Sequence, residues 1–479
     1  MMMWDFIEEK LNSFPSSWFY DGINKFQYGE IKEQTFLIGN ELKKRISRKS
    51  KCAIICDNGM MSAIAILSCW YADIVPVPMS KNYGEKHCIS IIEETHPDIM
   101  LTDEEEYFKK FGLFTYNIKN KRWLGNYIAS EYESELEDIA IIMSTSGTTG
   151  RPKGVLISDK GLISNIKAID NYFEINQGDI ILVARPLYHC AVFTGEFLIS
   201  IYKGLNICFY SGEYNPVAII NCVTKWEVTV LCGTPTMFHQ LALYMIRQNR
   251  SCSLRIMAIS GECLTKQVAN RIKEVFKDTD IYNVYGLTEA SPRVSYLPPK
   301  LFKDYSESVG IPLIHTNIEI HDDNGNELPS NQSGNVIVKS PSIMKGYYKN
   351  ERLTKEKITT EGLKTGDIGY KDENGYLYIL SRSDDMIIKA GMNIYPREIE
   401  KLLENLPFIN EIVAYGKKEE YGQKIAIKLV LKEEFTHMDQ REIMNRFSEC
   451  LPNYLMPNYI EVLKKLERNG SGKILRPRI

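Results

Sequence analysis

The first 300 residues alternate between short apolar runs and longer stretches whose apolar residues have helical spacing. Eight of the apolar runs are rich in β-branched residues and predict buried strands, at residues 52–56, 74–77, 139–143, 180–183, 205–210, 228–231, 255–259 and 280–284. Strands that alternate with helices indicate an α/β fold with mainly parallel sheets.

The pattern changes after Ser308. Residues 309–380 carry short alternating runs separated by turns such as Asp323-Asn324-Gly325 and Glu373-Asn374-Gly375. These turns predict hairpins and a β-rich subdomain.

The last part of the chain predicts a small α+β unit. Its expected elements are helices at 396–406 and 439–450 and strands at 409–415 and 424–431. A polar run at 383–385 is the expected linker. The domain prediction is therefore an N-terminal domain of residues 1–383, with its β-rich part at about 309–380, and a mobile C-terminal domain of residues 384–479.

One stretch, residues 60–79, is nearly free of charge. Asp73, Pro76 and Pro78 interrupt it, and its unbroken part is shorter than the roughly 20 residues that a membrane-spanning helix needs. It predicts a buried helix followed by a strand. Because the N-terminus also lacks the apolar core of a secretory signal, a cytoplasmic protein with no membrane span is expected.

The charge and cysteine content exclude some function classes. The net charge of −3 gives no excess of cations for binding nucleic acid. The 11 cysteines have no zinc-like paired spacing and indicate buried thiols in a reducing compartment.

The predicted strand at 139–143 leads into the sequence Ser-Thr-Ser-Gly-Thr-Thr-Gly-Arg-Pro-Lys-Gly at 144–154. Glycines let the backbone approach a ligand closely, hydroxyl and amide groups donate to phosphate oxygens, and Lys153 adds a cation. The loop suits a polyphosphate, although it lacks the Gly-Lys-Ser/Thr ending of a Walker loop.

This loop and four later motifs, in order along the chain, resemble the adenylate-forming (AMP-binding) superfamily, which includes acyl-CoA synthetases, peptide-synthetase adenylation domains and firefly luciferase. The later motifs are Tyr285-Gly286-Leu287-Thr288-Glu289, Thr365-Gly366-Asp367, Arg382 and Gly470-Ser471-Gly472-Lys473. The resemblance extends from about residue 26 to Lys473 and is strongest to stand-alone acyl-CoA or acyl-carrier-protein synthetases.

The resemblance implies that ATP and Mg²⁺ are bound. The residues expected to hold the triphosphate are Thr145, Ser146, Gly147, Thr148, Thr149, Gly150 and Lys153. Those expected around the adenine are Ser260, Gly261, Glu262, Tyr285 and Gly286. Asp367 and Arg382 would bind the ribose, Glu289 would hold the metal, Thr288 would contact the α-phosphate, and Lys473 would bridge the reacting groups.

Further positions match the second half-reaction. Asp384 matches the hinge about which the small domain of the family rotates, and Lys389, Ala390 and Gly391 match the channel for a pantetheine thiol. The chain departs from the common family pattern at Ser381, where a glycine is usual.

The acyl pocket is expected from residues 190–195, 233–236 and 290–294, whose small and apolar side chains suit an uncharged aliphatic or aromatic acid. The individual pocket residues are His189, Cys190, Ala191, Gly195, Thr234, Pro235 and Ala290. His189 would also act beside the thiol channel. Ala191 stands where amino-acid-activating relatives carry an aspartate, which disfavours an α-amino acid.

The predicted function is an ATP-dependent ligase that forms an acyl-adenylate and then a thioester. Coenzyme A and a separate acyl carrier protein stay open as acceptors. The basic Arg468, Lys473, Arg476 and Arg478 could meet an acidic carrier, or could form a solvated tail. The alternatives are an amino-acid-adenylating enzyme that loads a free-standing carrier protein and a non-catalytic nucleotide sensor.

Overall fold

The computed structural model describes residues 2–56, 59–80, 84–127, 132–146, 152–212, 214–250, 252–389, 392–419, 422–468 and 474–477. Within these ranges the chain forms a mixed α/β protein with a large N-terminal sheet domain and a small C-terminal domain.

A nine-stranded sheet lies at the centre of the large domain. In spatial order its strands are β16 (Ile311–Pro312), β15 (Arg293–Leu297), β14 (Asp280–Gly286), β13 (Ile256–Ile259), β12 (Val230–Gly233), β10 (Ile180–Val183), β11 (Asn206–Phe209), β1 (Trp18–Tyr20) and β2 (Lys25–Gln27). Strands β14 to β1 in this order pair in parallel, and the outer strands are antiparallel. The five strands predicted between residues 180 and 284 are all confirmed in the parallel part.

Both faces of this sheet are buried. Along β10, Ile181 and Val183 belong to one core cluster and Leu182 to another. This arrangement accounts for continuous apolar runs in place of alternating ones. One face is covered by α9 (Pro216–Lys225), α10 (Pro235–Gln248), α11 (Lys266–Val275) and α12 (Phe302–Tyr305). The other is covered by α6 (Asp159–Asp170), α7 (Cys190–Val192), the π-helical turn η3 (Phe193–Leu198) and α8 (Ile199–Lys203).

A second sheet has five strands. In spatial order they are β4 (Val75–Pro78), β3 (Lys51–Ile55), β5 (Ile99–Thr102), β6 (Thr115–Asn117) and β7 (Arg122–Leu124). The N-terminal helices are α1 (Met3–Ser13), α2 (Tyr28–Arg45), α3 (Gly59–Tyr71), α4 (Glu85–Thr95) and α5 (Glu105–Phe111). The strands predicted at 52–56 and 74–77 are confirmed, and so is the buried helix between them. Over the described ranges, none of the helices combines the length and apolarity needed to cross a membrane.

The strand predicted at 139–143 is present but longer. It is β8 (Ile139–Ser146), and it pairs antiparallel with β9 (Pro152–Ser158), which carries β19 (Gly346–Tyr347) on its other side. The predicted phosphate loop therefore joins two strands of a hairpin.

The β-rich segment forms a separate antiparallel sheet. Its strands are β17 (Asn317–His321), β18 (Gly334–Lys339), β20 (Ile358–Thr359), β21 (Gly362–Lys371) and β22 (Leu377–Arg382), and α13 (Glu351–Lys357) precedes β20. Both predicted turns are stabilised by an aspartate: Asp322 accepts from the backbone N–H of Asn324 at 2.9 Å, and Asp372 accepts from that of Asn374 at 3.0 Å.

The C-terminal part has its own core. Its elements are β23 (Ile387–Lys389), β24 (Met392–Ile394), α14 (Pro396–Leu403), β25 (Ile409–Glu419), β26 (Gly422–Leu431), α15 (Gln440–Cys450) and β27 (Tyr459–Val462). Ile387, Leu403 and Phe447 centre a cluster that shares no residue with the other cores. The predicted helix at 396–406 ends earlier, at Leu403.

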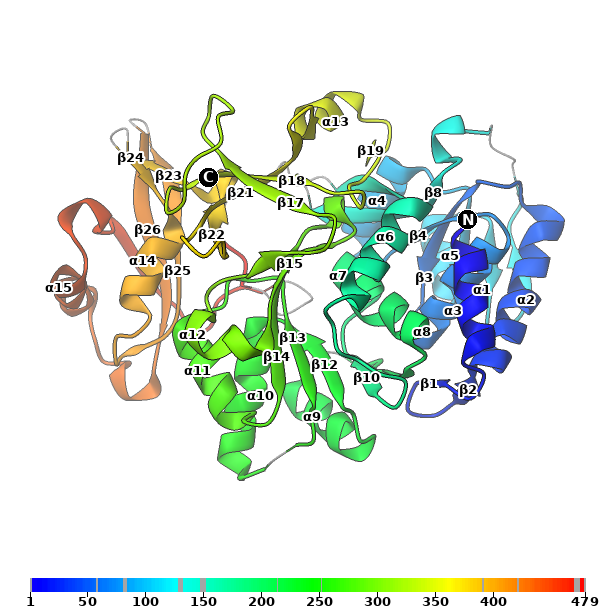
Figure 1. Ribbon diagram of the computed structural model, residues 1–479, viewed down its shortest axis with the longest axis horizontal. Coiled ribbons are helices and arrows are strands. Elements are labelled where there is room, and N and C mark those ends of the chain that lie inside the picture. The colour runs from blue at the N-terminus through cyan, green and yellow to red at the C-terminus, as the bar shows by residue number, and fades with distance from the viewer. Residues whose placement is uncertain are drawn as a thin grey trace.

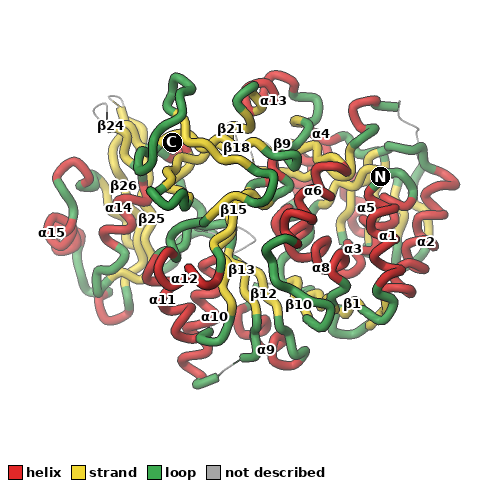
Figure 2. Tube along the Cα trace, in the orientation of Figure 1, coloured by secondary structure: helices red, strands yellow, loops and turns green. Residues whose placement is uncertain are grey.

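Short 3₁₀ turns complete the description: η2 (Ser134–Leu136), η4 (Thr288–Ala290), η5 (Pro299–Leu301), η6 (Ser383–Asp385), η7 (Glu433–Phe435) and η8 (Asn453–Leu455). Figure 1 places the C-terminal strands and α15 at the end of the molecule opposite to α1 and α2. Figure 2 shows the central strands β12 and β13 between these ends, with helices packed beside them.

Candidate functional site

The predicted site residues of the large domain gather at the carboxyl ends of parallel strands. Ser260 follows β13, Tyr285 and Gly286 end β14, and Thr234 follows β12. Because parallel strands end at one edge of the sheet, residues far apart in sequence meet there, and this edge is where open α/β sheets bind ligands.

Asp367 is the best-defined member of the site. It is 6% exposed, the Tyr285 hydroxyl donates to its Oδ2 at 2.5 Å, and Arg382 Nη1 donates to its Oδ1 at 3.1 Å. Burial, together with the Asp367 carboxylate, raises the pKa of Tyr285, so the phenol stays protonated. A buried carboxylate is thus held between the end of β14 and the end of β22.

Glu289 and Lys153 are connected through Tyr347, which the sequence analysis missed. The Tyr347 hydroxyl donates to Glu289 Oε1 at 2.8 Å, and the Lys153 ammonium lies 5.6 Å from the centre of the Tyr347 ring. Thr288 precedes Glu289 in η4, and Thr145 pairs across the β8–β9 hairpin with Lys153. Tyr347 lies on the edge strand β19, and no local motif marked it in advance.

A second missed residue is Lys357, the last residue of α13. A Cβ placed on Gly366 would lie 3.1 Å from Lys357 Nζ and 3.3 Å from Arg382 Nη2, so the ammonium stands beside the Thr365-Gly366-Asp367 turn. The pKa of Lys357 is lowered, first by burial and then by the nearby Arg382. Among the described residues this ammonium makes no hydrogen bond or ion pair, although the carboxylates of Glu289 and Asp384 act on it electrostatically.

The expected adenine wall is formed by a turn after β13. Gly261 has a φ of +91°, which favours glycine, and a Cβ added there would lie 3.8 Å from Thr234 Cγ2, in ordinary van der Waals contact. Glu262 Oε2 accepts from the Thr236 hydroxyl at 2.8 Å, and among the described residues its buried Oε1 has no donor. The Thr234 hydroxyl accepts from the N–H of Met237 at 3.2 Å and so caps α10, with Pro235 as the first residue of that helix.

The expected acyl pocket contains more charge than the sequence predicted. Cys190, Gly195 and Ala290 are buried and Ala191 is half-buried, as small lining residues would be. However, the buried guanidinium of Arg293 donates to the Gly195 carbonyl at 2.8 Å. Arg293 belongs to the segment 290–294 expected in the pocket wall, and β15 turns its side chain inward over Gly195, so a buried cation lies beside the small side chains. The small and apolar lining stays a prediction.

His189 is half-buried, its Nε2 atom is buried, and the nearby cation of Arg185 acts on it. Burial, together with the cation of Arg185, lowers its pKa to about 3, so the imidazole is neutral. Its Nε2 has no hydrogen-bond partner among the described residues.

The remaining predicted residues lie toward or within the C-terminal part. Asp384 is in η6, between β22 and β23. Lys389 Nζ donates to the carbonyl oxygens of Tyr454 at 2.9 Å and Met456 at 3.3 Å, which holds it within the small domain. Of Ser146 only the backbone is described. Gly147, Thr148, Thr149, Gly150, Ala390, Gly391 and Lys473 lie outside the described residues.

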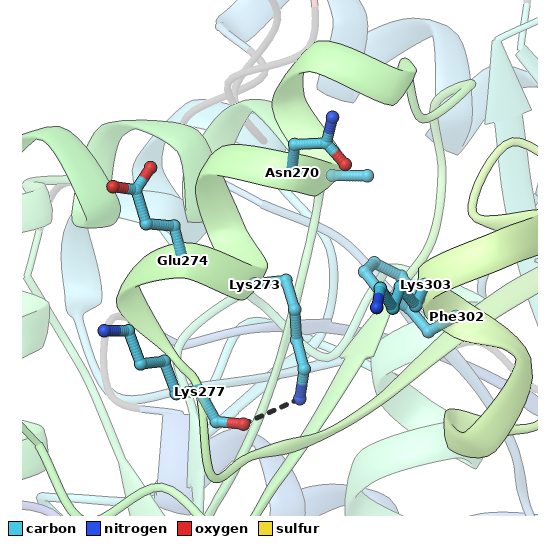
Figure 3. A pocket seen from close by; sticks show the side chains of 7 residues that line it. Asn270, Lys273, Glu274, Lys277, Phe302 and Lys303 are labelled. Atoms are coloured by element: carbon cyan, nitrogen blue, oxygen red, sulfur yellow. Dashed lines mark hydrogen bonds between the residues drawn. The ribbon is translucent and has the colours of Figure 1, made fainter.

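A surface pocket lies away from this edge. It is lined by Asn270, Lys273, Lys277, Phe302 and neighbours, and Lys273 donates to the Lys277 carbonyl at 2.8 Å (Figure 3). Lys273 also donates to the carbonyl of Thr279, just before β14 begins, so the pocket is at the amino-terminal edge of the sheet. It takes no part in the candidate site.

Comparison with known proteins agrees with this geometry. Residues 7–348 match the AMP-binding enzyme family, and residues 398–473 match the AMP-binding enzyme C-terminal domain. A 2-succinylbenzoate–CoA ligase of Bacillus cytotoxicus is 28% identical over 90% of this chain and 88% of the relative. A feruloyl-CoA synthase of an Amycolatopsis species is 29% identical over 71% of this chain and 69% of the relative.

Among solved structures, the o-succinylbenzoate CoA synthetase of Bacillus subtilis in complex with its acyl-adenylate intermediate has the same fold. The TM-score is 0.85 at 24% identity, and the match covers 99% of this chain and 97% of that one. The chain belongs to the AMP-binding enzyme family.

Proposed function

We propose that the enzyme uses ATP to convert a carboxylic acid into an acyl-adenylate with release of pyrophosphate, and then transfers the acyl group to the thiol of coenzyme A. The observation that carries the proposal is the meeting of two groups at one edge: Tyr285, Asp367 and Arg382 on one side, and Glu289, Tyr347 and Lys153 on the other.

The first group suits a nucleoside. A buried carboxylate accepts hydrogen bonds from both hydroxyls of a ribose, and Arg382 donates to the same sugar. The Tyr285 ring and the turn at Gly261 would lie against the adenine. The ribose hydroxyls would replace the donors that Asp367 now accepts from.

The second group suits a triphosphate with its metal ion. Lys153 and the adjoining glycine-rich loop would bind the β- and γ-phosphates, and Thr288 would donate to the α-phosphate. Mg²⁺ prefers oxygen ligands and is commonly bound through one carboxylate, phosphate oxygens and water. Glu289 fits this role, because its Oε1 is fixed by Tyr347 and, among the described residues, no cluster of three or more metal-binding side chains competes for the ion.

In this proposal the acid attacks the α-phosphorus in line with the departing pyrophosphate. The attacking carboxylate and the phosphate are both anions, so cations that reach both would lower the barrier. Lys473 would supply one of them from the C-terminal domain. Rotation about Asp384 would then exchange Lys473 for the channel formed by Lys389, Ala390 and Gly391, through which the thiol enters.

The proposal also covers the thiol acceptor and the class of acid. Coenzyme A is the acceptor that the named relatives use, and a phosphopantetheine carrier protein presents the same thiol. An α-amino acid remains disfavoured, since Ala191 provides no carboxylate for its ammonium group.

The test is pyrophosphate release across a panel of carboxylic acids, followed by thioester formation with coenzyme A or with phosphopantetheinylated carrier proteins. Glu289→Gln should lower pyrophosphate release at least about 100-fold, because the group that holds the metal is lost. Glu351→Gln is the matched control, since Glu351 is an exposed residue of α13 and its loss should leave the rate unchanged. Pyrophosphate release with no acid at all, or an unaffected Glu289→Gln enzyme, would contradict the proposal.

A further inference from the structure

A group of charged and polar side chains lies at the acyl end of the proposed site; four are buried and His189 is half-buried. We call it the buried polar cluster, and its members are Arg185, His189, Thr194, Glu196 and Arg293. Arg185 Nη2 donates to Glu196 Oε1 at 2.6 Å, and the two side chains are only 8% and 1% exposed. Arg293 Nη1 donates to the Tyr172 hydroxyl at 2.6 Å.

Four atoms of the cluster lack hydrogen-bond partners among the described residues: Arg185 Nε, His189 Nε2, Thr194 Oγ1 and Glu196 Oε2. Buried polar atoms are normally paired, so each unpaired one requires an explanation such as a bound molecule. All four come from the twelve-residue segment 185–196, which runs into the π-helical turn η3, a kind of turn frequent at functional sites.

The cluster also carries more positive than negative charge. Two guanidinium groups, of Arg185 and Arg293, act on a single carboxylate, that of Glu196. Burial raises the pKa of Glu196, and protonation of that group would only increase the excess of positive charge. Burial also raises the pKa values of the neighbouring Cys190 and Cys232 thiols to about 12, so neither of them supplies an anion.

The cluster lies within reach of the reacting groups. Arg293 follows Glu289 by four residues, and its guanidinium covers Gly195, where an added Cβ would lie 2.7 Å from Arg293 Nε. The pKa of the Cys190 thiol is raised by burial and also by the negative charge of Glu289. Cys190 stands five residues before Gly195. An acid whose reacting carboxylate lies beside Glu289 would therefore extend its other end toward Arg293.

We infer that the acid activated by this enzyme carries a second anionic group, a carboxylate, at the end remote from the one that is adenylated. That carboxylate would accept hydrogen bonds from Arg185 Nε and Arg293 and would balance the excess charge of the buried polar cluster. This assignment rests on the proposed adenylating function and narrows its substrate class.

The experiment compares matched acids by kcat/KM for pyrophosphate release. The pairs are 2-succinylbenzoate with 4-oxo-4-phenylbutanoate, and adipate with hexanoate; each pair differs by one remote carboxylate. The monoamide of adipate separates charge from hydrogen bonding. We expect the doubly charged acid of at least one pair to be preferred by about 10- to 100-fold, the effect of a charge-assisted hydrogen bond, and the amide to lie near hexanoate.

The variant Arg293→Met should bring the preferred pair to a ratio of about 1, and Arg293→Lys should restore part of the preference. Arg255→Met is the matched control: Arg255 lies at the opposite edge of the same sheet, and its loss should leave the ratio intact. If Arg293→Met does not fold, Thr194→Val removes one unpaired hydroxyl at nearly constant volume and should lower the ratio about 3- to 10-fold.

The inference is wrong if the singly charged acid or the amide is used equally well, or if the preference survives in Arg293→Met. No pyrophosphate with any acid would instead overturn the proposed function, and the substrate class with it. Binding without ATP gives a separate reading: adipate should raise the Tm of the wild-type enzyme more than hexanoate does, and equal shifts would contradict the inference.

Discussion

Strand β10 is flanked by two ion pairs that differ in how completely their polar atoms are paired. The carboxylate is buried in both, but Arg255 is 39% exposed and Arg185 only 8%. Before the strand, Asp179 accepts from Arg255 Nε at 3.0 Å, from the Thr229 hydroxyl at 2.8 Å and from the N–H of Asn176 at 2.7 Å. After the strand, the pair of Arg185 and Glu196 leaves Arg185 Nε and Glu196 Oε2 without partners among the described residues. The carboxylate of the first pair has donors on both oxygens, whereas the second pair leaves one donor atom and one acceptor atom unpaired.

The difference follows the direction of the strands. At the amino-terminal edge Asp179 ties β10 to its neighbour β12 and to β13, the next strand beyond. Burial alone would raise the pKa of Asp179, but the donors around it lower it. At the carboxyl edge the neighbours are loops that surround a ligand in this fold. The less exposed of the two pairs is therefore also the one with unpaired atoms, and in our proposal it is the one that meets the substrate.

The largest effect should come from breaking the complete pair. Asp179→Ala leaves Arg255, Thr229 and Asn176 without their acceptor and should lower the free energy of unfolding by roughly 3 kcal/mol, with kcat/KM of the folded enzyme unchanged. The double variant Arg185→Met with Glu196→Leu should cost less than about 1 kcal/mol, because well-packed apolar residues often replace a buried ion pair without loss. The double variant should, however, lose the preference in kcat/KM for the doubly charged acid of a matched pair.

Urea unfolding and the matched-acid assay measure both quantities on the same preparations. The contrast between the two pairs fails if the double variant is the less stable of the two, or if Asp179→Ala alters the choice of acid while the double variant does not.

The sequence predicted the strands well but not the burial of Arg293. Runs such as residues 180–183 and 256–259 are apolar at every position because both faces of the sheet are buried, and this signal is local. Arg293 carries no such signal, since its burial depends on Gly195 and Tyr172, about 100 residues away. Tyr347 and Lys357 were missed for the same reason: only pairing between β9 and β19, and packing of α13 on the Gly366 turn, brings them to the site.

A smaller effect concerns pH. His189 in the cluster has its pKa lowered to about 3, whereas an unfolded histidine titrates near 6.5. Between these values the unfolded chain binds a proton that the folded enzyme does not, so this residue makes stability fall as pH falls through the window from about 6.5 to 3. His189→Gln should remove about 1 kcal/mol per pH unit from that slope between pH 6 and 5, measured by urea unfolding at each pH.

The matched control is His315→Gln on the loop before β17, a position outside the cluster. Replacing it should leave the slope as in the wild-type enzyme. An unchanged slope in His189→Gln would mean that the imidazole is not held neutral, and the excess positive charge of the buried polar cluster would then be larger than inferred.

The smallest expected effect concerns Lys357, an unpaired cation near the proposed ATP-binding residues. Lys357 makes no hydrogen bond or ion pair among the described residues; it stands beside Arg382, and the Glu289 and Asp384 carboxylates act on it electrostatically. Lys355, two residues earlier, forms an exposed ion pair with Glu351 at 2.8 Å. In the proposed ATP-binding mode the Lys357 ammonium would contact phosphate, so Lys357→Met should raise KM for ATP about 3- to 10-fold with kcat nearly unchanged. Lys355→Met should change neither constant. If Lys357→Met instead lowers stability and leaves KM for ATP as it was, Lys357 only packs on the turn. An unpaired polar group would then mark a ligand-binding residue at the acyl end of the proposed site but not at the nucleotide end.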